Sequence, residues 1–98
     1  MEIKMSDTAL NWFKEEVGLK AGDKIKFYTK IYGSSPVQEN FSLGFTVDNE
    51  PLDIVVQTEK DGITFYVESA DLWYFNGHDL HVEYNAKIDE VEYQYKKA

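Results

Sequence analysis

Apolar residues recur along this chain with two periods, and the first of them is helical. Between Ser6 and Gly18 the apolar positions follow helical spacing, at Ala9, Leu10, Phe13 and Val17. Ser6 is a residue type that caps helix N-termini, and Gly18 stands where a left-handed residue ends a helix. The pattern predicts an amphipathic helix of about three turns, docked through one face, with Trp12 packing at the edge of that face.

After this helix the apolar period changes to two, which predicts strands. The expected strands cover 24–32, 41–47, 52–58, 63–68, 80–84 and 91–95. In the first of them, Ile25, Phe27, Thr29 and Ile31 are expected to point inward. Gly44 lies inside the second strand, where glycine indicates a bulge or the close approach of another backbone.

A second, shorter helix is predicted near the end of the chain. Ser69 is expected to cap a helical turn over 70–73, which Asn76-Gly77 closes. The run Leu72-Trp73-Tyr74-Phe75 is too apolar to face water on all sides, so it plugs one end of the sheet or forms an interface. The last residues, 96–98, are expected to fray.

Together these elements predict a single α+β domain over residues 1–98. Its mostly antiparallel, twisted β-sheets fold into two layers, with an N-terminal helix and a short second helix. No apolar run approaches the roughly 20 residues that cross a bilayer, and residues 1–4 lack the features of a signal peptide. A cytoplasmic location without a membrane partner is therefore expected.

Charge and cysteine content narrow the function classes. The net charge of −8 repels phosphate backbones and anionic membranes, so nucleic acid is not an expected partner. A stripe of basic and aromatic residues, Lys26, Tyr28, Lys30 and Tyr32, is therefore interpreted as a solvated strand face. The absence of cysteine excludes a disulfide, a thiol nucleophile and a cysteine-held metal or cluster in this chain.

The candidate metal-ligating or general-base residues are His78 and His81, accompanied by Asp79 and Glu83. On a strand, His78 points away from the other three, so a site with both histidines requires a turn at 77–78. No nucleophile elbow, phosphate-binding loop, dinucleotide fingerprint or calcium loop is present. These observations favour a protein that is not an enzyme and holds no cofactor.

A loop between two strongly patterned strands is the candidate ligand or partner site. Its candidate residues are Tyr32, Gly33, Ser34, Ser35, Gln38 and Asn40. The segment 33–36 is also well explained by local turn formation, because glycine supplies unusual dihedrals and proline sets the next bend. Neither serine has a histidine in its strand pair to act as a base.

The order of elements resembles the HesB/IscA-like family of A-type iron–sulfur carriers, over nearly the whole chain. The residues that carry the resemblance are the opening 3–9 with its helix, Tyr32-Gly33-Ser34-Ser35 after a strand, Phe41-Ser42-Leu43-Gly44-Phe45, Asp61-Gly62-Ile63 with Ser69, and the strand around Leu80 and Val82. Cluster-carrying members have a cysteine in this loop and a Cys-Gly-Cys segment near the C-terminus. Here Ser34 stands in the cysteine position, and serine is a poor ligand for such a cluster. The chain is most similar to the cysteine-less, YneR-like branch, which implies a HesB-like fold without a cluster.

The resulting hypothesis is a non-enzymatic binding or adaptor protein that acts through the loop at 33–40 or through the Trp73 region on an unspecified protein partner. One alternative is a weak metal-binding protein that uses His78, His81 and nearby carboxylates. Another is a structural oligomer joined through the aromatic cluster 73–75. The sequence leaves the oligomeric state open.

Overall fold

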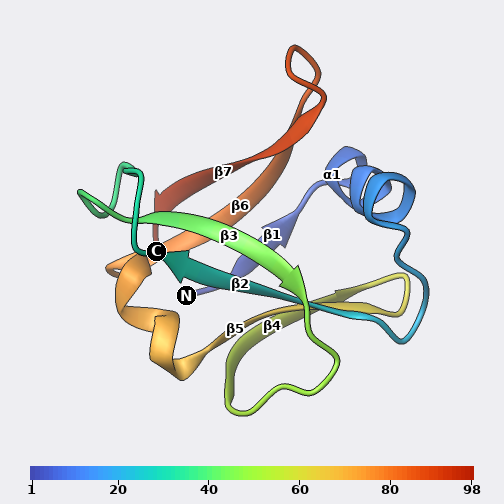
Figure 1. The fold of residues 1–98 in the computed structure, drawn as a ribbon, viewed down its shortest axis with the longest axis horizontal. Coiled ribbons are helices and arrows are strands. Elements are labelled where there is room, and N and C mark those ends of the chain that lie inside the picture. Colours follow the sequence, from blue (N-terminus) through green and yellow to red (C-terminus); the bar gives the residue numbers. More distant parts are fainter.

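The computed structural model describes residues 1–98, and its strands form two β-sheets that share one core (Figure 1). One sheet has the strand order β1-β6-β7 and the other the order β3-β2-β5-β4. The strands are β1 (Ile3–Met5), β2 (Lys24–Lys30), β3 (Ser42–Val47), β4 (Ile54–Lys60), β5 (Ile63–Glu68), β6 (His78–Asn85) and β7 (Glu90–Lys97). The helical segments are α1 (Asp7–Trp12), η1 (Phe13–Val17) and η2 (Ser69–Phe75). The predicted two-layer α+β architecture is confirmed.

Each sheet is mixed rather than purely antiparallel. The β2–β3, β4–β5 and β6–β7 pairs are antiparallel, whereas β1 pairs with β6 and β2 pairs with β5 in parallel. Both parallel pairs join segments that are distant in sequence, since parallel neighbours need a long crossover. The strand β1 has only three residues and was not predicted.

The N-terminal helix has its predicted boundaries. The Ser6 hydroxyl accepts a hydrogen bond from the Ala9 N–H at 3.1 Å, and Gly18 ends the helix with φ of 79°. The second half, η1, is wound as a π-helix. Trp12 packs edge-to-face on Phe13 and Phe45, and its indole N–H donates to the Asp89 carbonyl at 2.9 Å. The predicted packing role of Trp12 is confirmed.

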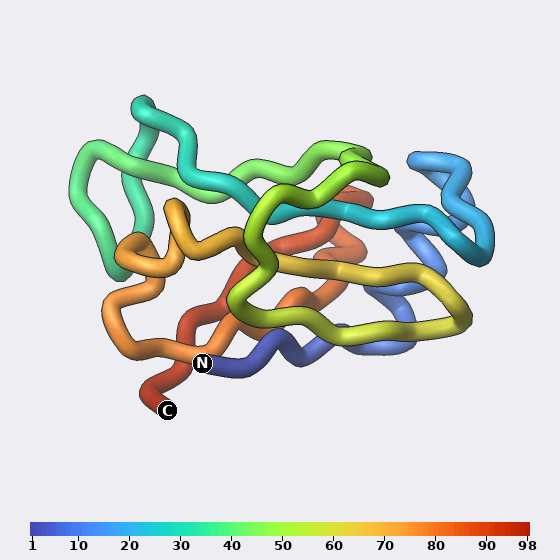
Figure 2. Tube along the Cα trace, turned by 90° about the horizontal axis from the view of Figure 1, so that it is seen from below, coloured from blue at the N-terminus to red at the C-terminus, as the bar shows by residue number.

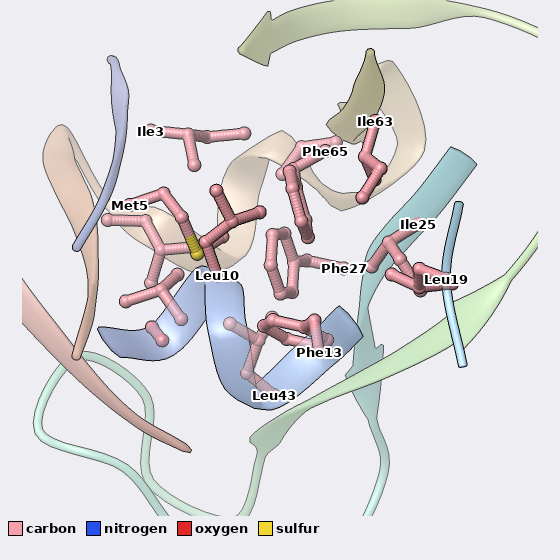
Figure 3. Close-up of a cluster of buried hydrophobic side chains, with 14 of the residues drawn as sticks. Ile3, Met5, Leu10, Phe13, Leu19, Ile25, Phe27, Leu43, Ile63 and Phe65 are labelled. Carbon is pink, nitrogen blue, oxygen red and sulfur yellow. The ribbon is translucent and has the colours of Figure 1, made fainter. Parts of the chain in front are cut away.

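The core lies between the sheets and is centred on phenylalanine rings (Figure 3). Phe13 from η1 meets Phe27 of β2 and Phe65 of β5, and all three are fully buried. Leu10 and Met5 close the core on the side of β1, and the helix therefore binds both sheets together. Burial of so many rings supplies much of the free energy that favours folding.

Several sequence predictions are wrong at the ends of elements. Strand β2 stops at Lys30, so Ile31 is 84% exposed instead of pointing inward. Strand β7 continues to Lys97, which pairs with His78, so the predicted fraying does not begin at Lys96. Both strands end where pairing with the neighbouring strand ends, because backbone pairing and not the local apolar pattern decides the length of a strand.

The start of η2 also differs from its prediction. Glu68 occupies the N-cap position and no side chain caps the helix. Ser69 instead points its N–H and hydroxyl at Asp53, whose carbonyl oxygen is 3.0 Å from the Ser69 nitrogen. The predicted cap by Ser69 is therefore wrong, whereas Asn76 and Gly77 close the helix with positive φ as expected.

Gly44 lies in regular register opposite Tyr28, so the predicted bulge is absent. A Cβ atom at Gly44 would lie 3.0 Å from Cδ of Lys30 and 3.1 Å from Cζ of Tyr28. The close approach therefore comes from two side chains of β2 and not from another backbone. Glycine lets these side chains lie flat across β3.

One carboxylate, at the end of β5, is buried beside the β3–β4 connection. Glu68 is 9% exposed, and its Oε2 accepts hydrogen bonds from the Leu52 N–H at 2.6 Å and the Asp53 N–H at 3.0 Å. Lys26 Nζ lies 3.5 Å from Glu68 Oε1 and 3.5 Å from an Asp48 oxygen. The backbone N–H groups of Asp53 and Leu52 hold the pKa of Glu68 below its usual value, and the charge of Lys26 adds to the effect.

Candidate functional site

The candidate loop, residues 32–40, lies in the connection from β2 to β3 (residues 31–41), which is closed at its base by a side chain of β3. The Ser42 hydroxyl donates to the Tyr32 carbonyl at 2.8 Å. Gly33 has φ of 86°, and a Cβ atom there would lie 2.9 Å from the Ser42 Oγ. Glycine is therefore required at this turn by both conformation and space. Asn40 reverses the chain at the other end of the loop with φ of 71°.

The serines of the loop serve its own geometry. The Ser35 N–H donates to the Gln38 carbonyl at 3.1 Å, and the Ser35 hydroxyl accepts from the Gln38 N–H at 3.2 Å. Ser34 is exposed. Neither serine is hydrogen-bonded to a histidine, because His78 Nδ1 instead lies 3.0 Å from the carbonyl oxygens of Phe75 and Asn76. The arrangement is that of a folded turn and not of a nucleophile with its base.

The structure joins this loop to η2, which the sequence did not predict. The Gln38 side-chain amide donates to the Trp73 carbonyl at 3.4 Å, and Phe41 packs edge-to-face on Trp73 with ring centroids 5.1 Å apart. Asp71 in turn accepts a hydrogen bond from the Thr29 N–H of β2 at 3.1 Å. The loop and η2 lie at the same end of the molecule in both orthogonal views (Figures 1 and 2). We call residues 31–41 together with Leu72 and Trp73 the loop–η2 surface.

The aromatic cluster 72–75 divides between core and surface. Tyr74 and Phe75 are fully buried, as a plug of the sheet end would be. Leu72 is 38% exposed and Trp73 is 49% exposed, as interface residues would be. Tyr74 and Phe75 therefore plug the sheet end, as one interpretation of the sequence predicted, whereas Leu72 and Trp73 have the exposure that the other interpretation, an interface, requires.

Buried hydroxyl groups hold the inner half of the cluster in place. The Tyr74 and Tyr95 hydroxyls are 2.8 Å apart and link η2 to β7. Burial, followed by this hydrogen bond, raises the pKa of Tyr95, and burial also raises the pKa of Tyr93. The hydrogen bond between the Tyr74 and Tyr95 hydroxyls anchors to β7 the segment that carries Trp73.

The start of the same loop carries further exposed apolar side chains and a cation–π contact. Tyr32 is 66% exposed, and the Lys30 ammonium lies 5.3 Å from the centre of its ring. Ile31 is also exposed on this surface. An outward-facing Ile31 was missed because the alternating pattern of β2 continues one residue beyond the strand itself.

The two histidines are not brought together with carboxylates. The structure contains no group of three or more His, Cys, Asp or Glu side chains with the spacing of a metal site. His81 pairs with Gln94 and Lys4 on the neighbouring strands, whereas His78 begins the same strand opposite Lys97 and its Nδ1 faces the Phe75 and Asn76 carbonyl oxygens. None of the helices is long and apolar enough to cross a membrane.

The chain was compared with known protein families and proteins. No protein-family model matches it. It is 45% identical to the pyruvate dehydrogenase inhibitor of Bacillus subtilis, over 98% of this chain and 100% of that protein. It is also 39% identical to an uncharacterised protein of Staphylococcus saprophyticus and 33% identical to one of Staphylococcus aureus, in each case over 98% of this chain and 100% of the relative. The chain therefore belongs to the family that includes the Bacillus subtilis pyruvate dehydrogenase inhibitor and these staphylococcal proteins.

Proposed function

We propose that this chain is a non-catalytic inhibitor that binds pyruvate dehydrogenase through the loop–η2 surface. The observation that carries this proposal is the 45% identity, over the full length of both chains, to a protein that bears the name of such an inhibitor. A chain of this size without a catalytic constellation inhibits by occupying a surface of its target, so the question becomes which surface it uses.

The loop–η2 surface has the composition of an interface centre. Tryptophan and tyrosine are the side chains that most often dominate binding free energy, and Trp73 and Tyr32 are both exposed here. Trp73 is already oriented by Phe41 and Gln38, so binding costs little further side-chain ordering. The net charge of −8 favours a target with a basic surface around this apolar centre.

Alanine substitution of Trp73 tests the proposal. Trp73→Ala is expected to weaken inhibition of a purified pyruvate dehydrogenase complex by about tenfold or more, since truncation of a central tryptophan costs about 2 kcal/mol or more. Inhibition is measured as residual NADH production against inhibitor concentration. The wild-type chain should inhibit in the same assay.

The matched control is Ile88→Ala at the β6–β7 turn. Ile88 is an exposed hydrophobic side chain (57%) on a hairpin that points away from the loop–η2 surface (Figure 1). This variant should inhibit like wild type. If the wild-type chain leaves the complex fully active, the inhibitor proposal is wrong. If Trp73→Ala and Ile88→Ala weaken inhibition equally, only the assignment of inhibition to the loop–η2 surface is wrong.

We further propose that the fold is HesB-like and that the loop occupies the place of a cluster-ligating segment. Support comes from the order of the elements and from Ser34, which is exposed in the β2–β3 loop, where the resemblance places the cluster-ligating cysteine. Anaerobic reconstitution with iron and sulfide is expected to leave the protein without cluster absorption bands. A stoichiometric cluster spectrum would contradict this proposal and leave the inhibitor role untouched.

A further inference from the structure

The two sheets leave an open side between the edge strands β3 and β7. Each is the last strand of its sheet, and no ladder connects them. Between them lies a hollow of about 420 Å³. Its apolar lining comes from both sheets and from the helix, and includes Trp12, Leu43, Phe45, Val91 and Tyr93. Its charged lining consists of Lys30 and Glu90, and Tyr32 also lines it. We call this hollow the edge groove.

The outer edge of β3 carries free backbone hydrogen-bonding groups. The Asp48 N–H donates to the Lys24 carbonyl at 3.0 Å. This bond shows which of the alternating residue pairs in the antiparallel β2–β3 ladder are hydrogen-bonded. Hydrogen-bonded pairs alternate in such a ladder, so the N–H and C=O groups of Leu43 and Phe45 point away from β2 and toward the groove. None of the backbone hydrogen bonds formed outside the helices and strands involves either residue. Such an edge is a template for an added strand.

An acidic hollow adjoins the edge groove at Trp12. This second hollow measures about 200 Å³ and is lined by Trp12, Glu15, Glu16, Tyr84 and Asp89. None of its three carboxylates takes part in a salt bridge. A hydrogen bond to Asp89, together with burial and the charges of Asp89, Glu16 and Glu15, raises the pKa of Tyr84. The negative charge at this end of the groove is thus not neutralised within the chain.

We propose that the edge groove binds an extended segment of a partner protein that adds to β3 as a strand and carries a lysine or arginine at one end. Alternate apolar side chains of that segment pack against Trp12, Phe45 and Val91, and the basic side chain enters the acidic hollow. A second copy of this chain fits poorly, because each copy carries a net charge of −8. The inference goes beyond the inhibitor function, since it specifies a peptide class and not a target enzyme, and the two surfaces share only the Tyr32 side chain.

The test uses a synthetic peptide of alternating threonine and valine that ends in two lysines. The protein carries Trp73→Phe, so that Trp12 is its single tryptophan. Adding the peptide is expected to shift Trp12 fluorescence and to slow hydrogen exchange at the Leu43 and Phe45 amides, as measured by NMR. The same peptide N-methylated at alternate residues keeps its charge and side chains but cannot pair with β3, so it should not bind.

Charge variants test the acidic end. The double variant Glu15→Lys/Glu16→Lys should weaken peptide binding by about fivefold, whereas Glu50→Lys/Glu59→Lys, with the same change in net charge, should leave it near the wild-type value. All four glutamates are exposed, so neither variant should disturb folding, and circular dichroism checks this. The proposal would be overturned if the unmodified peptide did not bind, or if the N-methylated peptide bound equally well. It would also be overturned if self-association of the free protein already protected the Leu43 and Phe45 amides from exchange.

Discussion

Replacing Phe13 with alanine is expected to lower the free energy of unfolding by about 3–5 kcal/mol. Phe13 is fully buried, and its ring lies 5.1 Å from that of Phe45 and 5.2 Å from that of Phe65. The cavity would open where η1 meets β3 and β5, where backbone segments on several sides prevent collapse. Since small domains have a total stability of about 5–15 kcal/mol, a large part of the native stability would be lost. Urea unfolding followed by circular dichroism measures the change.

The matched control for this substitution is Glu16→Ala, three residues further along η1. Glu16 is exposed, so its removal should change stability by about 0.5 kcal/mol or less. A loss below about 1 kcal/mol for Phe13→Ala would mean that the phenylalanine cluster is not the centre of the core.

Replacing Glu68 with glutamine should destabilise the protein at neutral pH and change how its stability depends on acid. The Leu52 and Asp53 N–H groups both bond to Oε2, so an amide oxygen can still accept both, but without the added strength of a charged acceptor. The amide also replaces Oε1, which faces Lys26, with an N–H₂ group and removes the negative charge. The pKa of Glu68 is lowered in the folded state, so the ionised carboxylate stabilises the fold. This contribution to the free energy of unfolding is fully present above the unfolded-state pKa of about 4.3. It is lost as the pH falls through the lower folded-state pKa.

Wild type and Glu68→Gln should therefore differ most at pH 7 and converge well below pH 4, as measured by urea unfolding at several pH values. Glu59→Gln on β4 is the control, because Glu59 is exposed and forms no salt bridge. An unchanged gap between wild type and Glu68→Gln down to the most acidic condition would show that the carboxylate charge of Glu68 does not support the fold.

The two candidate regions of the sequence turn out to be one surface. The loop at 32–40 and the Trp73 cluster are separated by more than an entire β-hairpin in the chain, yet Gln38 and Phe41 both contact Trp73. The sequence identified the loop by its place between two strongly patterned strands and the cluster by its apolar composition. Their union is a consequence of β2 and β5 pairing in parallel, which brings the end of β2 beside the start of η2.

The sequence by itself determined those features that depend on near neighbours. The cap at Ser6, the left-handed Gly18, the strand Ile63–Glu68 and the turn at Asn76-Gly77 were all predicted, because capping, dihedral preference and alternation act within a few residues. The lack of cysteine likewise excluded thiolate chemistry without any structure.

Only the tertiary structure decided the features that depend on distant partners. These include the parallel β1–β6 pair, the exposure of Ile31 and the open edge of β3. They also include Ser69, which bonds to Asp53 and therefore does not cap η2. The physical reason is that strand pairing and sheet order are set by contacts between residues far apart in the chain, and no local period encodes which edge remains free. The two surfaces proposed for binding are both products of that long-range arrangement.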